Sequence, residues 1–236
     1  SEAWVDAATC KQVSNGSNPG SDWNQGYGYK FWMCRHGLYR GDGAFGQYCI
    51  VMPRQDAVLA ITSGSGDMQG ILDAVWEYLL PAMKDGPLPS DEENLGRLNQ
   101  KLQELSLSYV EGEESSALAA EVCGKTFIFE ASDGLYKQVF FDFKANPKEI
   151  ILTTEQGEHS IKAGYGKRVT STWPSPFLES QKVAVDGAWT APDTFTVNLV
   201  YYETPESMKI IFSFREDSLF MHTRRRASFG PGQDVQ

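Results

Sequence analysis

The stretch that decides the fold of the first part of the chain runs from Gly26 to Pro53 and reads GYGYKFWMCRHGLYRGDGAFGQYCIVMP. Apolar and aromatic residues recur at every second position from Tyr27 to Met33, and residues 48–52 are continuously apolar. Both patterns are typical of β-strands. Four glycines between residues 37 and 46 allow a tight turn between these two runs. The stretch therefore predicts a strand, a glycine turn and a second strand.

The residues after Pro53 extend this pattern by one strand and one helix. A third apolar run covers residues 57–62, and Ser65 is an acceptable N-cap for a helix that begins after it. The next apolar residues form the single stripe of an amphipathic helix: Met68, Ile71, Leu72, Val75, Trp76, Leu79 and Leu80. We therefore expect antiparallel strands that end in a helix.

Several short sequence motifs in this region resemble the C-terminal end of the serine β-lactamase and penicillin-binding-protein family, especially its class C and esterase-like members. The motifs are Tyr27-Gly28-Tyr29, Phe31-Trp32, Gly43-Ala44-Phe45-Gly46, Ile50-Val51-Met52-Pro53 and Trp76-Glu77-Tyr78-Leu79-Leu80. The resemblance covers residues 1–83. It implies a hydrolase of small ester, amide or peptide-like substrates that uses no cofactor.

The resemblance also implies that part of the active site is missing. The family's site has three elements: a Ser-x-x-Lys nucleophile at a helix start, a Tyr-x-Asn or similar loop, and a Lys-Thr-Gly or His-x-Gly strand. No Ser-x-x-Lys and no Tyr-x-Asn occurs in these residues. Acyl transfer of this kind depends on the nucleophile and its base. We therefore expect a C-terminal fragment that is inactive alone and lacks the N-terminal catalytic segment of a serine hydrolase parent.

Two segments are candidates for the third element. Counting back from Phe45 places Leu38-Tyr39-Arg40 there, whereas residue type selects Arg35-His36-Gly37, and neither is the full pattern. In the family this strand donates a backbone N–H to the oxyanion hole and presents a cation or hydroxyl to the substrate carboxylate. The predicted substrate-binding residues are Arg35, His36, Gly37, Tyr39, Arg40 and Gly41, with no catalytic residue in this chain.

Arg40 and His36 each have a structural alternative. A guanidinium at position 40 can hold a substrate carboxylate with two parallel hydrogen bonds at the rim of the site. Arg40 can equally pair with Asp42 or lie in a solvated turn. A histidine beside a glycine turn is more often a structural group than a catalytic base, and this is the interpretation favoured for His36.

A break in composition predicts two domains. Residues 84–89, KDGPLP, contain residues that stop helices and form surface connections. Ser90 and Glu93 then form a capping box. The helix it opens has an apolar face, and we expect this helix to dock across the junction: Leu95, Leu98, Leu102 and Leu105. The predicted division is residues 1–83 for the hydrolase-like part, 84–121 for linker and helix, and 122–236 for a β-domain.

From Lys125 onward the sequence pattern changes to short β-rich runs separated by turn residues. The runs are residues 126–130, 138–143, 149–152, 183–190, 195–202, 208–214 and 219–223, and Ser132-Asp133-Gly134 is one of the turns. This pattern predicts an antiparallel meander, closed as a barrel or curled as a half-barrel. The predicted fold class is α+β: antiparallel strands plus a C-terminal helix of a β-lactamase-like domain, followed by a barrel-like β-domain.

Two alternatives come from different classes. A lipocalin-like barrel would bind a small apolar ligand, with four aromatic residues as lining: Trp173, Trp189, Phe195 and Tyr201. Alternatively, residues 1–83 fold by pairing with a second copy, which would give a homodimer through sheet edges that lack neighbours.

Composition argues against several partners. The formal charge is −10 with a pI of about 4.8, so the basic run at residues 224–226 is expected to protect a sheet edge rather than bind nucleic acid. No apolar run approaches the ~18 residues of a membrane helix. Four cysteines without C-x-x-C spacing indicate no metal site, and Cys34 and Cys49 are expected in the core.

The compartment is not encoded in these residues. We expect a soluble protein of the bacterial cytoplasm. Ser1 starts inside a fold, so a signal peptide on a longer parent would not appear in this sequence.

Overall fold

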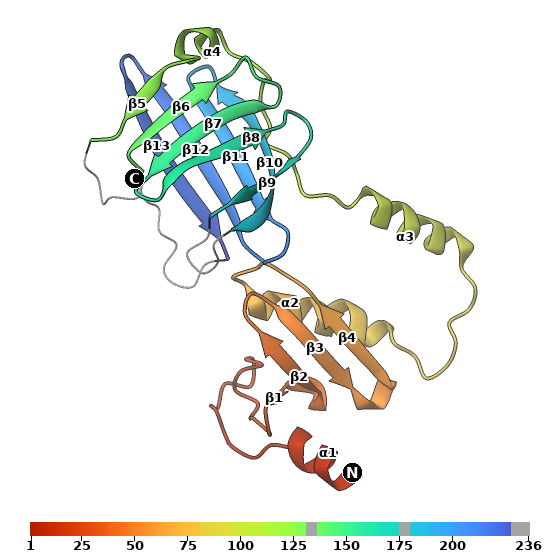
Figure 1. The fold of residues 1–236 in the computed structure, drawn as a ribbon. Helices are drawn as coiled ribbons and strands as arrows, with labels where there is room; N and C mark the ends of the chain where they lie inside the picture. Colours follow the sequence, from red (N-terminus) through yellow and green to blue (C-terminus); the bar gives the residue numbers. More distant parts are fainter. Residues whose placement is uncertain (131–135, 175–179, 228–236) are drawn as a thin grey trace. The chain divides into compact units, whose positions relative to one another are not determined.

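A computed structural model describes residues 1–130, 136–174 and 180–227 of the chain. The chain divides into two compact units, Ser1–Leu105 and Ser106–Gln236 (Figure 1). All three sheets are antiparallel, one of four strands in the first unit and two of four and five strands in the second. The fold is therefore mixed α+β with a β-rich character. No helix among the described residues is long and apolar enough to span a bilayer.

The first unit is a small sheet with flanking helices. Its elements are α1 (Glu2–Thr9), β1 (Trp32–Met33), η1 (Arg35–Gly37), β2 (Tyr39–Gly43), β3 (Gln47–Met52), η2 (Pro53–Gln55), β4 (Ala57–Ile61), α2 (Met68–Ala74), η3 (Val75–Leu79), η4 (Leu80–Ala82) and α3 (Glu92–Glu104). The strands are hydrogen-bonded in the order β1-β2-β3-β4. Consecutive strands are neighbours because short turns join them.

Two features of this sheet differ from the sequence prediction. Strand β2 occupies the middle of the expected glycine turn. Its hydrogen bonds with β3, where Gly41 lies opposite Cys49, outweigh the low strand propensity of glycine. The tight turn is shorter and has positive φ at Phe45 (63°) and Gly46 (85°). The expected strand from Tyr27 onward is reduced to β1 and single bridges, since Lys30 has a φ of 70° that interrupts an extended backbone.

Helix α2 begins at a different N-cap from the one predicted. The Asp67 side chain, not Ser65, accepts the N-terminal hydrogen bond, from the Gly70 N–H at 2.9 Å. The helix continues through a π turn and a 3-10 turn. Its predicted apolar stripe packs on the sheet except at Leu79, which is 37% exposed. The shared core contains Cys34, Leu38, Tyr48, Ile50, Met52, Leu72, Val75 and Trp76.

The register of the sheet separates two unlike faces. Arg40, Ile50 and Leu59 lie opposite one another on the face that α2 covers (Figure 1). The other face, here called the open face, carries Tyr39, Gly41, Cys49, Val51, Val58 and Ala60. These side chains are exposed or half-buried, and Val58 is 65% exposed. The expectation that Cys49 lies in the core is wrong, because alternate residues of β3 point to opposite faces; Cys34 is buried as expected.

Helix α3 comes after the connection of residues 83–91. Its N-cap is Asp91, whose side chain accepts from the Asn94 N–H at 3.0 Å, one residue later than the predicted capping box at Ser90. The predicted leucine stripe is present on the helix and is exposed, by 57% at Leu95, 54% at Leu98, 56% at Leu102 and 64% at Leu105.

The second unit contains one short helix and nine strands among its described residues. They are α4 (Ala117–Val122), β5 (Thr126–Ile128), β6 (Gln138–Asp142), β7 (Lys148–Thr154), β8 (Gly157–Ala163), β9 (Val169–Trp173), β10 (Gln181–Ala191), β11 (Thr194–Tyr201), β12 (Ser207–Arg215) and β13 (Ser218–Arg226). The predicted meander is present. Strands β8 and β9 and helix α4 were not predicted, and the turn expected at residues 132–134 lies outside the described residues.

The strands of the second unit form two separate sheets and no closed barrel among the described residues. The sheet orders are β5-β6-β7-β8 and β13-β12-β11-β10-β9, and the two sheets lie face to face (Figure 1). Aromatic rings fill the space between them, with the Phe141 ring 5.1 Å from Phe212 and 5.2 Å from Phe214. Large side chains from both sheets need two opposed layers.

A buried ion pair attaches residues 107–113 to the second unit. Asp186 is 1% exposed, and its carboxylate pairs with Arg168 at 3.1 Å and accepts from the Val110 N–H at 2.6 Å. The Arg168 guanidinium also lies 4.7 Å from the Tyr109 ring centroid. Residues 107–113 are therefore held to the second unit, which spans Ser106–Gln236.

Candidate functional site

The six predicted site residues lie on a short stretch of the first unit but do not converge. Arg35, His36 and Gly37 form the turn η1 between β1 and β2, whereas Tyr39, Arg40 and Gly41 belong to β2 itself. Side chains alternate along a strand, so Tyr39 and Gly41 are on the open face and Arg40 is on the face beneath α2.

Arg40 lies in the interior of the unit. Its side chain is fully buried, and its Nη2 and Nε atoms lie 2.7 and 2.9 Å from Asp42 Oδ2. Its Nη1 donates to the backbone oxygen of Asp22 at 3.0 Å, and its guanidinium lies 4.7 Å from the Trp23 ring centroid. Arg40 thus pairs with Asp42, which is the structural alternative to binding a substrate carboxylate. Its guanidinium is buried and does not lie at the rim of a site.

Aromatic rings surround the guanidinium of Arg40, with the ring centroids of Trp23, Trp32 and Tyr48 at 4.7, 5.8 and 5.7 Å. Burial raises the pKa of Asp42, and the charge of Arg40 offsets only part of that effect. Burial likewise raises the pKa of the Cys34 thiol to about 11, although Arg40 Nη1 donates to its Sγ at 3.3 Å. Cys34 therefore stays protonated at neutral pH and is a poor nucleophile.

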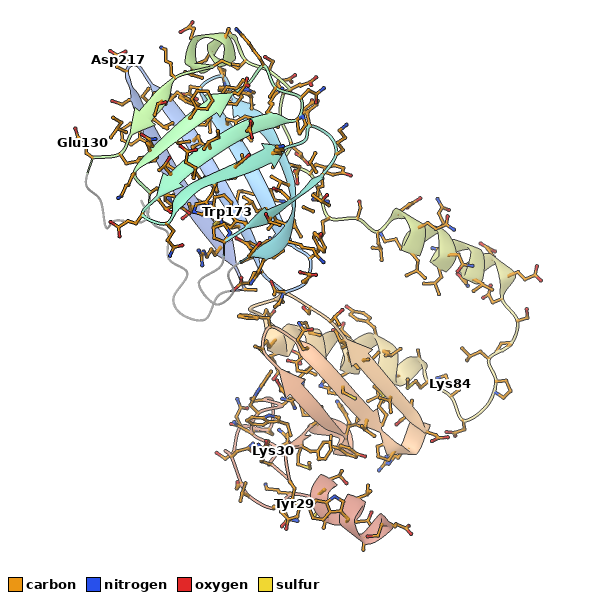
Figure 2. The ribbon with its side chains drawn as sticks, viewed as in Figure 1. Tyr29, Lys30, Lys84, Glu130, Trp173 and Asp217 are labelled. Carbon is orange, nitrogen blue, oxygen red and sulfur yellow. The ribbon has the colours of Figure 1, made fainter. Side chains whose placement is uncertain are left out.

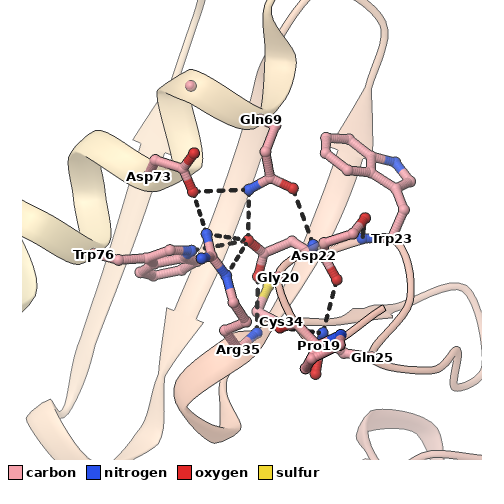
Figure 3. A network of polar contacts seen from close by, with 12 residues as sticks. Pro19, Gly20, Asp22, Trp23, Gln25, Cys34, Arg35, Gln69, Asp73 and Trp76 are labelled. Atoms are coloured by element: carbon pink, nitrogen blue, oxygen red, sulfur yellow. Dashed lines mark hydrogen bonds and ion pairs between the residues drawn. The ribbon is translucent and has the colours of Figure 1, made fainter. Parts of the chain in front are cut away.

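A buried carboxylate, Asp22, joins the turn η1 to helix α2, and the sequence contained no motif that indicated it (Figure 3). The Asp22 side chain is 0% exposed. It accepts hydrogen bonds from the Arg35 N–H (2.8 Å) and Nε (2.9 Å), from Gln69 Nε2 (2.7 Å) and from Trp76 Nε1 (3.0 Å). Arg35 also pairs with Asp73 on α2. Partners up to 54 positions apart in sequence meet here, which explains why spacing could not reveal the network.

The hydrogen bonds to Asp22 decide its charge. Burial by itself would raise the pKa of this carboxyl, but the donors from Trp76, Gln69 and Arg35 outweigh burial, and the pKa is lowered from its ordinary value of 3.8. Asp22 is thus ionised at neutral pH and is held by donors from Arg35, Gln69 and Trp76. Arg35 is a predicted substrate-binding residue, but its guanidinium forms ion pairs with Asp22 and Asp73.

His36 and Gly37 occupy the exposed end of the same turn. Both have left-handed backbones, with φ of 64° and 73°. That conformation is uncommon for residues other than glycine, although histidine adopts it more often than most. The His36 ring lies 5.5 Å from the ring of Trp76, so it is on the side of the sheet that α2 covers. It does not share a face with Tyr39 or Gly41.

Gly41 has no packing reason for its lack of a side chain. Its φ is not positive, and a Cβ at this position would meet only the Cβ of Cys49, at 3.8 Å. In addition, β1 pairs with β2 only at Tyr39 and Arg40, so residues 41–43 have β3 as their one strand neighbour among the described residues. A glycine inside a strand often marks the close approach of a ligand or another backbone.

The aromatic residues proposed for a lipocalin-like site lie inside the second unit. Trp173, labelled in Figure 2, is 4% exposed, and Trp189, Phe195 and Tyr201 are 2%, 0% and 6% exposed. Trp189 and Phe195 pack against each other at 5.5 Å. Their surroundings are those of an apolar core.

The described residues contain no group of three His, Cys, Asp or Glu side chains placed to hold a metal ion. Of the six predicted site residues, Tyr39 and Gly41 are the two that lie on the open face. No family model, curated protein or solved structure matches this chain.

Proposed function

We propose that residues 1–83 are the closing strands and helix of a β-lactamase-like serine hydrolase domain. Its substrate is a small ester, amide or peptide-like molecule. The Ser-x-x-Lys nucleophile comes from residues outside this sequence, and residues 1–236 alone are inactive. The support is the set of sequence motifs that resemble this family, together with the order of antiparallel strands followed by a helix on one face.

The observation that carries the proposal is the open face of the sheet. None of its six residues is charged: Tyr39, Gly41, Cys49, Val51, Val58 and Ala60. An apolar sheet face in a soluble protein is normally buried against a second layer. In the family that this region resembles, the third active-site element lines the site, and a nucleophile-bearing segment packed on the open face would meet β2 there.

The proposal gives the predicted site residues unequal roles. Tyr39 lies on the open face with its ring 5.5 Å from that of Phe31, and Gly41 lets a substrate approach the backbone of β2. Arg40 supports the strand from beneath through Asp42. Arg35 and His36 belong to the turn that Asp22 anchors and shape the end of the sheet.

Covalent labelling tests the proposal. Intact-mass spectrometry of this chain with a fluorophosphonate or penicillin probe should show no adduct, and nitrocefin and p-nitrophenyl esters should remain unhydrolysed. The longer product of the same reading frame should be labelled at a serine outside this sequence. In that product, Gly41→Val should abolish labelling, because an isopropyl group would block the approach to β2.

Gly86→Val is the matched control, since Gly86 lies in the connection after η4 with open space around it. It should leave labelling unchanged. A stoichiometric adduct on the chain alone would overturn the proposal. So would a longer product that is never labelled, or one whose labelling survives Gly41→Val.

A further inference from the structure

Helix α3 has an apolar stripe that calls for a partner. Leu95, Leu98, Leu102 and Leu105 are each more than half exposed, and they recur at the three- and four-residue spacing of one helix face. The residues around this stripe are polar. A helix of this kind gains most of its stability by packing the apolar face against another surface.

Charge and length exclude two of the partners that such a helix could take. Membrane-surface helices carry basic polar faces, but α3 has three acidic residues, Glu92, Glu93 and Glu104, against Arg97 and Lys101. A coiled coil of two α3 helices would contain only the eleven residues from Leu95 to Leu105, well short of the three to four heptads that such pairs need.

The open face of the sheet has the size and polarity of the missing partner. The leucine stripe is about 15 Å long at a rise of 1.5 Å per residue. The six residues of the open face lie on three strands, β2, β3 and β4, which are about 4.8 Å apart and roughly 17 Å long. Both surfaces are apolar and neither carries a charge, so their contact would leave no ion buried without a partner.

The connection between the two surfaces is long enough. Helix α3 is joined to η4 by the nine residues from Met83 to Asp91, which reach about 30 Å when extended. A path from the helical layer on the covered face to a helical layer on the open face crosses about 20 Å, since packed layers lie about 10 Å apart. The tether also keeps the effective concentration of α3 near the sheet high.

We propose that α3 lays its leucine stripe on the open face and forms a third layer over the sheet. This contact between α3 and the open face is proposed for residues 1–236 alone and does not rest on the hydrolase role. A nucleophile-bearing segment that packs on the same face would have to displace α3.

Cys49 reports directly on this contact, because its thiol lies on the open face. Alkylation with iodoacetamide is followed by mass spectrometry on the tryptic peptide from Gly41 to Arg54, which contains no other cysteine. The exposed Cys10 is the internal reference. Cys49 should react at least tenfold more slowly than Cys10, and equal rates in the unmodified chain would overturn the proposal.

Two double variants test whether the leucine stripe, rather than another face of α3, protects Cys49. The double variant Leu98→Glu/Leu102→Glu should bring the alkylation rate of Cys49 up to that of Cys10. The control Gln100→Glu/Gln103→Glu adds the same charge away from the stripe and should leave Cys49 protected. Protection that persists in the leucine variant would show that α3 is not the cover.

Dilution and cross-linking distinguish α3 from a second copy of the chain. Protection by the tethered helix should be independent of protein concentration, whereas protection by a homodimer should disappear on dilution, and that outcome would also overturn the proposal. The variant Leu98→Cys should form a disulfide with Cys49 within one chain under mild oxidation. Only disulfides between chains would contradict the contact.

Discussion

The two units stabilise their sheets by different means. The second unit closes two sheets on each other around a cluster that is apolar throughout and rich in aromatic rings. In the first unit, helix α2 covers one face of the single sheet, and the charged groups Asp22 and Arg40 are buried beside a much smaller apolar cluster. The buried carboxylate of the second unit, Asp186, instead attaches residues 107–113 to the outside of the paired sheets. A closed pair of sheets can rely on apolar burial, whereas a one-sided sheet with long loops depends on directed hydrogen bonds to hold those loops.

The largest expected effect is the loss of an aromatic ring in the second unit. Phe141 is fully buried and contacts the rings of Phe212 and Phe214. Phe141→Ala should lower the free energy of unfolding by about 3–5 kcal/mol, because it removes apolar burial and leaves a cavity. Urea unfolding followed by circular dichroism measures the change. The control Phe220→Ala, at a ring 57% exposed, should shift it far less; equal effects would refute an apolar origin of stability.

Removal of the buried carboxylate should be nearly as damaging in the first unit. Asp22→Ala leaves Arg35, Gln69 and Trp76 with unpaired donors and should cost about 3 kcal/mol. Hydrogen–deuterium exchange of the peptides that contain Gln69 and Trp76 would measure it in the first unit alone. Asp73→Asn changes a carboxylate whose side chain is 50% exposed and should cost under about 1 kcal/mol. A neutral Asp22→Ala would mean that solvent already reaches the network.

Acid should lower the free energy of unfolding of the first unit by protonating Asp22. The pKa of Asp22 in the folded chain is below its ordinary value of 3.8, so its stabilisation is complete above the pKa of the unfolded chain. That stabilisation is lost as the pH falls from about 4 through the folded pKa. Asp42, whose pKa is raised by burial, acts in the opposite direction. Unfolding curves between pH 6 and pH 2.5 should therefore converge for wild type and Asp22→Asn at low pH, and curves that stay parallel would contradict this assignment.

The smallest expected effect concerns the connection between η4 and α3. Residues 84–91 contain no helix or strand and are exposed, so limited proteolysis should begin there. The C-terminal product should unfold in urea within about 0.5 kcal/mol of the second unit in the intact chain. First cleavage inside β6–β12, or a product that does not fold, would show that the second unit is not self-contained.

The sequence was sufficient for elements whose pattern is local. Alternation and turn residues predicted β3, β4 and most strands of the meander, and the helical stripe predicted α2 and α3. It did not predict β2, because glycines at 41 and 43 look like a turn until a neighbouring strand pairs with them. It also did not predict β8 and β9, whose residues are mostly polar and belong to strands only through their ladder partners.

The contacts of the candidate site residues were not predictable from the sequence. The motif resemblance selected the segment from Arg35 to Gly41 as a candidate site. It did not indicate that Arg40 is buried with Asp42, or that Arg35 is held by Asp22. Those pairings join residues from separate loops, and no pattern of spacing encodes them.

The sequence by itself thus determined the α+β class, the antiparallel strands and the apolar stripes, because periodicity along a chain reflects which residues face an apolar layer. Only the tertiary structure decided which face of the sheet is covered, that Cys49 points away from the core, and that the meander forms two opposed sheets. These outcomes depend on contacts between distant segments, where the free energy of burying a whole surface outweighs the preference of any single residue.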